Sequence, residues 1–400
     1  MGQRYIYIVA TYDTKKAEAE FVKSIVEFHG LGVKTLDIST KEKRNYGADY
    51  SNQEIASYFN ETKVFCGDRG KATIAMSEAL RSFVQTHQSE IAGVLGLGGS
   101  GGTAMIAPAL QALPIGLPKM ILSTMASGNI APYIGASDIN MMYSVTDIAG
   151  LNRISKPILT SAAHQIMGAV HFKAAIDTSE SKPAIGMTMF GVTTPCVSKL
   201  HNMLDEENDG IIFHATGAGG KAMEKLIDSY LIDGVLDMTT TEICDYLFGG
   251  VLACDADRFG AIARTKIPCV LSCGALDMVN FGRKSSMPEN YKNRLLYEHN
   301  AEVTLMRTTA EENRQMGEWI ANKLNQCEGQ VRFMIPLKGF SAIDIENGPF
   351  WDAQADKAFI RAFEATFKQT DKRKLIKLDL HINDDEFAQA AYNEFCAIMK

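Results

Sequence analysis

The chain has 400 residues, more than one ordinary hydrophobic core holds, so we expect two domains. Its 46% hydrophobic and 22% charged residues are ordinary for a soluble globular protein. The formal net charge of −7 and the pI of about 5.7 argue against a general role in binding nucleic acid or a membrane surface, because phosphate backbones favour clustered Lys and Arg.

The first part of the chain alternates between two kinds of segment. Short apolar runs predict buried strands, and segments with apolar residues at helical spacing predict helices. The polar stretch 39–52 predicts a long loop of the kind that often carries function. We expect strands at 5–10, 33–38, from 91, at 119–125 and at 139–145, and helices at 15–29, 71–87, directly after residue 102 and at 157–175. This alternation predicts an α/β fold with a mostly parallel sheet.

The polar segment 177–183 predicts a linker, and the same alternation restarts after it. We therefore expect an N-terminal domain over 1–180 and a C-terminal domain over 183–400. In the second domain we expect strands at 184–190, 210–215, near Val235, at 269–276, 331–337 and 375–381, and helices at 195–204, after residue 217, at 309–324, 352–367 and 384–399.

The segment 91–103, IAGVLGLGGSGGT, is typical of a buried strand, a tight turn and the start of a helix. Glycine lets a backbone approach a ligand closely, and a helix N-terminus offers free N–H groups to an anion. We interpret the turn as a phosphate cradle. It lacks the acidic residue about 20 positions later that a nicotinamide dinucleotide site needs, and it has no P-loop lysine. The expected phosphate contacts are Gly98, Gly99, Ser100, Gly101, Gly102 and Thr103.

Two other interpretations of this turn stay open. It matches the pattern GxSxG of a hydrolase nucleophile elbow, with Ser100 as the nucleophile, Asp138 or Asp147 as the acid and His164 or His171 as the base. It could also be a purely structural turn.

Other polar side chains follow the predicted strands of the first domain. In an open α/β sheet, ligands bind at the carboxyl ends of the strands. Thr11, Asp13 and Thr14 follow the first strand and could instead cap its helix, whereas Arg153 could either pair with a phosphate or lie at the surface. The further nucleotide-binding candidates are therefore Thr11, Asp13, Thr14, Thr124, Asp147 and Arg153.

A second polar pocket is predicted from the C-terminal domain. A glycine-rich turn at 217–220 again follows a strand, which ends at His214, although a lone His in an apolar strand is more often a core residue. The stretch 307–312 is also typical of a helix start with acidic residues in its first turn. The pocket residues that we expect are His214, Gly217, Gly219, Gly220, Asp277, Asn280, Arg307, Ser341 and Asp344, alone or with Mg²⁺, and the catalytic candidates are His214, Asp277 and His381.

The eight cysteines lie mostly in apolar runs, and only Cys269 and Cys273 are close in sequence. No second pair or His follows at zinc spacing, so we expect these cysteines to be buried free thiols rather than metal ligands. Charged residues interrupt the apolar start of the chain, which therefore lacks the pattern of a secretory signal. We expect a cytoplasmic protein.

Several motifs resemble one family. They lie at 10–15, 96–105, 121–129, 143–154, 214–224, 275–282 and 336–344. This set is similar to the family of the ATP-binding N-terminal domain of the tomato mosaic virus resistance protein, over nearly the whole chain. The resemblance implies two Rossmann-like subdomains, self-association as a dimer or tetramer, and ATP bound in the first subdomain through Thr11, Asp13, Thr14, residues 98–103 and Thr124.

In the plant protein a barrel domain follows the resembling part, and we expect that barrel to be absent from this chain and a separate barrel protein to be a potential partner. The expected function is nucleotide binding, of ATP alone or with Mg²⁺, with a second small ligand between the subdomains. Two alternatives remain: a metabolic enzyme that acts on a small phosphorylated or carboxylated substrate in that cleft, and a serine hydrolase that uses Ser100.

Overall fold

The structure, a computed structural model, describes residues 4–172, 182–204 and 207–399. The chain divides into two compact units, Met1–Asp177 and Thr178–Lys400. Most of the predicted linker, residues 177–181, lies outside the described residues. None of the helices in the described part of the chain has the length and apolar character that a membrane-spanning segment needs.

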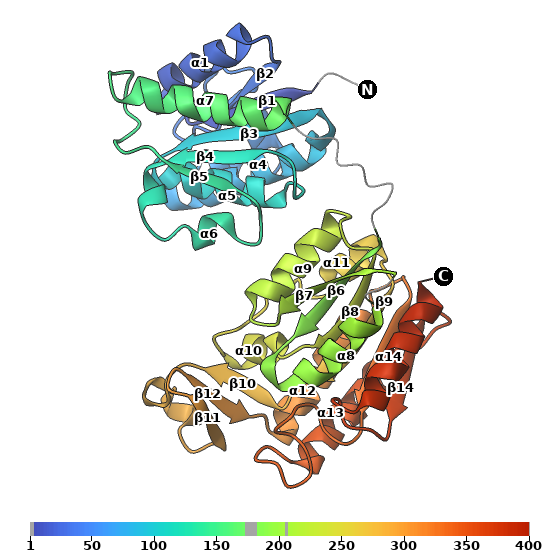
Figure 1. The fold of residues 1–400 in the computed structure, drawn as a ribbon. Coiled ribbons are helices and arrows are strands. Elements are labelled where there is room, and N and C mark those ends of the chain that lie inside the picture. The colour runs from blue at the N-terminus through green and yellow to red at the C-terminus, as the bar shows by residue number, and fades with distance from the viewer. Residues whose placement is uncertain (1–3, 173–181, 205–206, 400) are drawn as a thin grey trace. The chain divides into compact units, whose positions relative to one another are not determined.

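Unit 1 contains a five-stranded parallel sheet in the order β2-β1-β3-β4-β5 (Figure 1). Its strands are β1 (Tyr5–Ala10), β2 (Val33–Asp37), β3 (Ile91–Gly98), β4 (Lys119–Ser123) and β5 (Asn140–Tyr143). Its helices are α1 (Tyr12–Phe28), α2 (Asn52–Ser57), α3 (Glu61–Val64), α4 (Arg69–Thr86), α5 (Ser100–Ala112), α6 (Ala131–Ile134) and α7 (Ser155–His171).

Helices cover both faces of this sheet (Figure 1). On one face, α1 and α7 pack against β1, β3 and β4 through a core that includes Val22 and Leu159. On the other face, α4 and α5 contribute Leu80 and Ile106 to a second core. Central strands buried on both sides are apolar throughout, and this explains why their sequences predicted them well.

Unit 2 contains a six-stranded parallel sheet in the order β14-β13-β9-β8-β6-β7. Its strands are β6 (Ala184–Met189), β7 (Asp209–His214), β8 (Gly234–Thr239), β9 (Cys269–Gly274), β13 (Val331–Pro336) and β14 (Arg373–Leu378). Its helices are α8 (Thr194–Leu204), α9 (Ala218–Asp228), α10 (Glu242–Phe248), α11 (Gly260–Thr265), α12 (Ala310–Leu324), α13 (Ala353–Thr366) and α14 (Asp385–Ile398). The predicted α/β class with two Rossmann-like subdomains is confirmed.

Three strands of unit 2 were not predicted. They form an antiparallel sheet in the order β10 (Met278–Phe281), β12 (Val303–Arg307), β11 (Leu296–Asn300), which stands beside the parallel sheet (Figure 1). Strand β11 is mostly exposed and polar, so it lacks the apolar run by which the buried strands are recognised. Arg307, expected at a helix start, therefore ends a strand, and the helix begins after Thr309, which forms a capping box with Glu312.

The first helix also differs from its prediction. It begins at Tyr12 rather than at residue 15, and it is kinked at Lys15, where φ is −128° and ψ is 21°. The kink separates a short first turn, which follows the end of β1, from the amphipathic body of the helix. Helical periodicity could only detect that body.

An aromatic core holds α13 against β13. The rings of Phe333 and Phe363 are stacked with their centroids 4.1 Å apart, and Phe359 lies beside both. All three side chains are fully buried. Their burial makes this contact a strong contributor to the stability of unit 2.

We predict that Phe363→Ala destabilises unit 2 by about 3–5 kcal/mol, because it removes a large buried ring and leaves a cavity. Urea unfolding, followed by circular dichroism, measures the change. The control is Tyr230→Ala, because the side chain of Tyr230 is 80% exposed, and it should leave the midpoint nearly unchanged. Equal effects of the two substitutions would contradict the packing described here.

Candidate functional site

The strand order of unit 1 places a crevice between β1 and β3. The chain leaves β1 into α1, on one face of the sheet, and leaves β3 into α5, on the opposite face. The two connections therefore diverge at the carboxyl ends of neighbouring strands. Ligands of open α/β sheets bind at such a switch point, and the order 2-1-3-4-5 places it between β1 and β3.

The N-terminus of α5 opens into this crevice. Gly99 is the N-cap residue and has no side chain to cap the helix, so the first amide groups of α5 gain no side-chain acceptor from it. The first backbone bond of the helix is that from Thr103 N to Gly99 O, at 2.9 Å. The 13-residue helix α5 thus presents the positive end of its dipole and free N–H groups to the crevice.

The glycines of this turn fall into two groups when a β-carbon is placed on each. On Gly98 it would lie 2.6 Å from the backbone nitrogen of Thr103, so the fold itself requires glycine there. On Gly99, Gly101 and Gly102 the nearest atoms would lie at 3.8, 3.7 and 3.6 Å, which is ordinary van der Waals contact. The protein therefore has room for a side chain at these three positions, and their small size leaves space for a ligand.

A cavity of about 850 Å³ lies at this place. It brings together nine of the twelve predicted nucleotide-binding residues, from the ends of β1, β3, β4 and β5. These are Thr11, Asp13, Thr14, Gly99, Ser100, Gly101, Gly102, Thr124 and Asp147. A drug-sized or nucleotide-sized ligand fits a volume of this order.

Three predicted residues do not line the cavity. Gly98 and Thr103 lie behind it, where the Thr103 hydroxyl is 2.6 Å from that of Ser123 in a buried contact between α5 and β4. Arg153 is exposed and lies outside the lining. Gly98 and Thr103 shape the turn, whereas Arg153 has the surface position that was the alternative to pairing with a phosphate.

A cationic group beside the turn, Arg69, was not predicted from the sequence. A β-carbon on Gly101 would lie 3.7 Å from Nη2 of Arg69, and both residues line the cavity. Arg69 begins α4, whose N-cap Asp68 accepts from Lys71 N at 3.0 Å. No salt bridge occupies its guanidinium within the described residues. The N-cap aspartate was the available sequence signal for this helix start.

Two lysines also line the cavity. Nζ of Lys15 donates to the carbonyl of Ile148 at 2.7 Å, and Nζ of Lys41 lies 3.5 Å from Oδ2 of Asp13. Lys41 comes from the loop that follows β2, within the stretch 39–52 that was predicted to be a long loop. Together with Arg69 they give the cavity three basic side chains beside the carboxylates of Asp13, Asp68 and Asp147.

A buried carboxylate fixes the turn after β1. Oδ1 of Asp37 accepts from Tyr12 N at 3.1 Å and lies 2.5 Å from the Ser39 hydroxyl, which in turn is 3.2 Å from Oδ1 of Asp13. Burial raises the pKa of Asp37. Asp37 ends β2 and is the last but one residue of the strand predicted at 33–38. The sequence therefore indicated that it lies near a strand end, but it did not indicate that Asp37 orients Asp13.

The hydrolase interpretation lacks a base. Ser100 lines the cavity, but no histidine does so among the described residues. His164 lies on α7, and its ring packs against that of His29, with centroids 5.5 Å apart. Without a histidine near Ser100, the geometry of a catalytic triad is missing.

The second glycine turn has the same local pattern and a different environment. Oε1 of the buried Glu242 accepts from the amides of Gly217 at 2.7 Å and of Gly220 at 3.1 Å. Gly219 packs so tightly that a β-carbon on it would lie 1.9 Å from the carbonyl oxygen of His214. The N-terminus of α9 is therefore filled by the chain's own carboxylate rather than open to a ligand.

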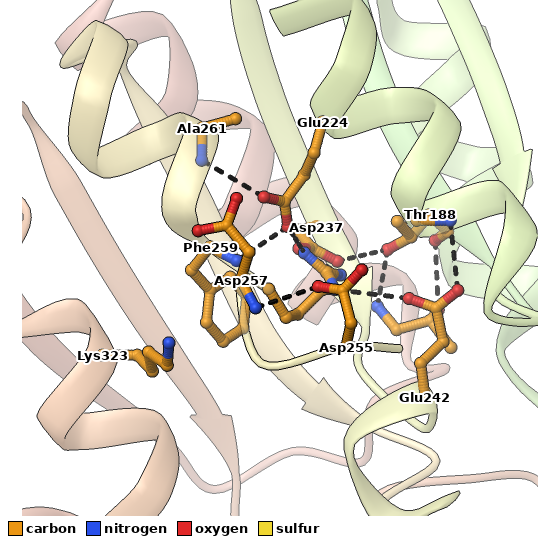
Figure 2. Close-up of polar contacts among 12 residues, drawn as sticks. Thr188, Glu224, Asp237, Glu242, Asp255, Asp257, Phe259, Ala261 and Lys323 are labelled. Atoms are coloured by element: carbon orange, nitrogen blue, oxygen red, sulfur yellow. Dashed lines mark hydrogen bonds and ion pairs between the residues drawn. The ribbon is translucent and has the colours of Figure 1, made fainter. Parts of the chain in front are cut away.

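Three carboxylates of this region surround the guanidinium of Arg258. Figure 2 shows Glu224, Asp237 and Glu242 converging from α9, β8 and α10. The guanidinium nitrogens lie 3.0, 2.7 and 3.3 Å from their respective oxygens, and all four side chains are almost fully buried. Glu224 also accepts from the amides of Phe259 and Ala261. This network ties the loop before α11 to the sheet.

Four of the predicted second-pocket residues do meet, in another buried cluster. The Ser341 hydroxyl donates to Oδ2 of Asp277 at 2.8 Å, and Nη2 of Arg307 lies 3.5 Å from Oδ1 of Asp344 and 2.7 Å from Oδ1 of Asp356. Burial, reinforced by the charge of Asp344, raises the pKa of Asp277 to about 8. The same two causes raise the pKa of Asp356 to about 7.

The remaining predicted residues lie apart from that cluster. The ring of His214, at the edge strand β7, contacts Phe190, and β6 and β8 separate β7 from β9. Asn280 bonds to Asp245 and Thr241. Nε2 of His381 lies 2.9 Å from the carbonyl of Ser341, at the margin of the cluster. The three catalytic candidates therefore do not converge on one point.

Comparison with known proteins identifies relatives along the whole chain. The family model for the N-terminal domain of the uncharacterised protein family UPF0261 matches residues 4–175, and that for its C-terminal domain matches 182–399. A UPF0261 protein of Rhizobium meliloti is 51% identical over 389 residues, which are 96% of this chain and 97% of that protein.

Two further relatives come from distant organisms. A UPF0261 protein of Clostridium tetani is 43% identical over 403 residues and is covered to 99%. The ToMV resistance protein Tm-1(GCR237) of Solanum lycopersicum is 41% identical over 418 residues, which are 98% of this chain and 55% of the tomato protein.

We predict that Arg258→Gln destabilises unit 2 by about 3–5 kcal/mol at pH 8, because three buried carboxylates lose their shared cation. Urea unfolding measures the effect. The control, Arg264→Gln, removes the guanidinium that pairs with Asp228 and Asp257, but this side chain is 49% exposed and its loss should cost about 1 kcal/mol or less. A loss for Arg258→Gln as small as for the control would contradict the network.

The raised pKa of Asp277 predicts a dependence of stability on pH. The unfolded chain releases this proton near the usual aspartate pKa, whereas the folded chain keeps it to about pH 8, so stability falls as the pH rises between these values. Asp277→Asn removes this contribution, so its unfolding free energy relative to the wild type should rise with pH, by up to about 1.4 kcal/mol per pH unit. Parallel stability profiles between pH 5 and 8.5 would refute the assignment.

Proposed function

We propose that this chain, which belongs to the UPF0261 family, binds a nucleotide, ATP, in the cavity of unit 1, with the phosphates at the N-terminus of α5. The observation that carries the proposal is the turn at Gly99, Gly101 and Gly102. These glycines are not needed by the packing of the protein, and they surround free amides at a topological switch point.

The charges of the cavity support a phosphate chain rather than a neutral ligand. Arg69 lies beside the turn and has a guanidinium that suits bidentate contact with a phosphate. Lys41 lies across the crevice, after β2. An anion in the cavity would accept hydrogen bonds from the amides of α5 and would pair with these cations, in place of the water that otherwise solvates both groups.

Mg²⁺ is part of the same proposal. The carboxylates of Asp13 and Asp147 lie at the ends of β1 and β5, on the wall of the same cavity. Mg²⁺ in nucleotide sites is held by one or two carboxylates together with phosphate oxygens and water. In this arrangement the metal would offset the negative charge of both the ligand and the wall.

The resemblance found in the sequence motifs implies the same ligand. Four expectations from the sequence stay predictions: a second small ligand between the subdomains, self-association, a separate barrel partner and a metabolic reaction. No contact among the described residues provides evidence for them.

The test is calorimetric titration with ATP, ADP and AMP, each with and without Mg²⁺. We expect affinity to fall with each phosphate that is removed. In Gly101→Ala a methyl group enters the space beside Arg69, and binding of ATP should weaken at least about tenfold, whereas the fold should persist because that space is open in the protein. The matched control is Gly168→Ala in α7, a helical glycine with no neighbouring atom within 4 Å of a β-carbon and no place in the cavity lining.

Equal affinity of both variants for ATP would place the ligand elsewhere. Absence of binding of all three nucleotides to the wild type would remove the proposal itself.

A further inference from the structure

The cavity of unit 1 has a polar side and an apolar side. Thr11, Asp13 and Lys41 line it at the ends of β1 and β2. Tyr143 and Val145, which we call the apolar side, line it at the end of β5, where the polar Thr146 and Asp147 follow them in the lining. The register of the sheet aligns Gly98, Ser123 and Tyr143 on neighbouring strands. Two strand spacings, about 10 Å, therefore separate the α5 turn from the apolar side.

Val145 has an unusual backbone conformation. Its φ is +63°, in the left-handed region that β-branched residues rarely adopt. The residues around it hold this conformation: Thr146 N donates to the carbonyl of Ser144 at 2.6 Å, and the Ser144 hydroxyl donates to the carbonyl of Thr146 at 2.7 Å. Ser144 itself is buried and bonds to Ser123 of β4. The turn is thus fixed to the sheet.

The side chain at this strained backbone position does not pack in the hydrophobic core. Val145 is 60% exposed and Tyr143 is 43% exposed, although both are large apolar residues. Glycine or asparagine would adopt this backbone at less cost. Strain of this kind is concentrated at ligand sites, where the surrounding structure maintains it. Since the valine gains no burial in the protein, its apolar surface is available to a ligand in the cavity.

We propose that Tyr143 and Val145 form the seat of the aromatic base of the nucleotide, and that this contact selects a nucleoside polyphosphate over a free polyphosphate or a sugar phosphate. This inference rests on the proposed function, since it takes the phosphates to lie at the α5 turn. The base lies against the Tyr143 ring and the Val145 methyl groups at the end of β5. The sugar spans the end of β4.

Thr124 occupies the intermediate position. It follows β4, between the two sides, and a β-carbon on Gly99 would lie 3.8 Å from its Oγ1. Its hydroxyl therefore lies at the junction of the phosphate and sugar positions. The order α5 turn, Thr124, Tyr143 matches the order phosphate, sugar, base along a nucleotide. A sugar phosphate would leave the apolar side in water.

The test compares ATP with inorganic tripolyphosphate, which carries the phosphates alone. The wild type should bind ATP at least about tenfold more tightly, because stacking of a base on an aromatic side chain contributes on this scale. Tyr143→Ala and Val145→Gly should each remove most of this difference while leaving the affinity for tripolyphosphate unchanged. Val145→Gly should also not lower the melting temperature, since it relieves the strained φ.

Val145→Asn provides a second variant that suits the left-handed backbone but lacks the apolar surface, and it should behave like Val145→Gly. The control is Ile154→Ala, because Ile154 is a similarly exposed apolar residue of unit 1 outside the cavity lining. It should change neither affinity.

The outcomes separate this inference from the proposed function. Equal affinities of the wild type for ATP and tripolyphosphate, or equal losses for both ligands in Tyr143→Ala and Val145→Gly, would overturn the base seat and leave the phosphate site intact. Binding of neither ligand to the wild type would overturn both.

Discussion

The free amide groups at the start of α5 are the feature on which the account of unit 1 depends. A helix that begins with an uncapped glycine leaves N–H groups that need an acceptor. In unit 2, the corresponding helix α9 receives that acceptor from Glu242. In unit 1 no side chain of the described residues fills the same role, and a cavity with Arg69 on its wall lies there instead. Two turns with the same local pattern thus have opposite environments.

The difference between the two turns is set by distant residues. Glu242 lies 22 positions after Gly220, at the start of α10, and strand β8 lies between α9 and α10 in the sequence. Its carboxylate pairs with the guanidinium of Arg258. A buried carboxylate that accepts backbone N–H groups and pairs with a guanidinium is a stable substitute for a bound anion. Unit 2 therefore uses its buried charges internally, and its second cluster, around Arg307, is likewise enclosed. The open cavity with a polar lining is found in unit 1.

The sequence predicted most of the parallel strands because they are buried on both faces and read as apolar runs, as in β1 and β3. It did not predict β11, whose exposed polar residues pair only through the backbone. Nine cavity residues were predicted because the carboxyl ends of parallel strands meet at one edge. Arg69 was missed because its place beside Gly101 arises from the packing of α4 on α5, which no local pattern encodes. The left-handed backbone of Val145 was equally invisible, since its sequence, SVT, favours an extended chain.

The amides of the α5 turn can be observed directly. In protein labelled with ¹⁵N-glycine, the signals of Gly101 and Gly102, identified by their loss in Gly101→Ala and Gly102→Ala, report on the N–H groups that we assign to the phosphates. Titration with ATP should shift these two signals strongly and leave those of Gly217 and Gly220, which already bond to Glu242, in place. Shifts at the unit 2 glycines with none at Gly101 and Gly102 would contradict the central claim.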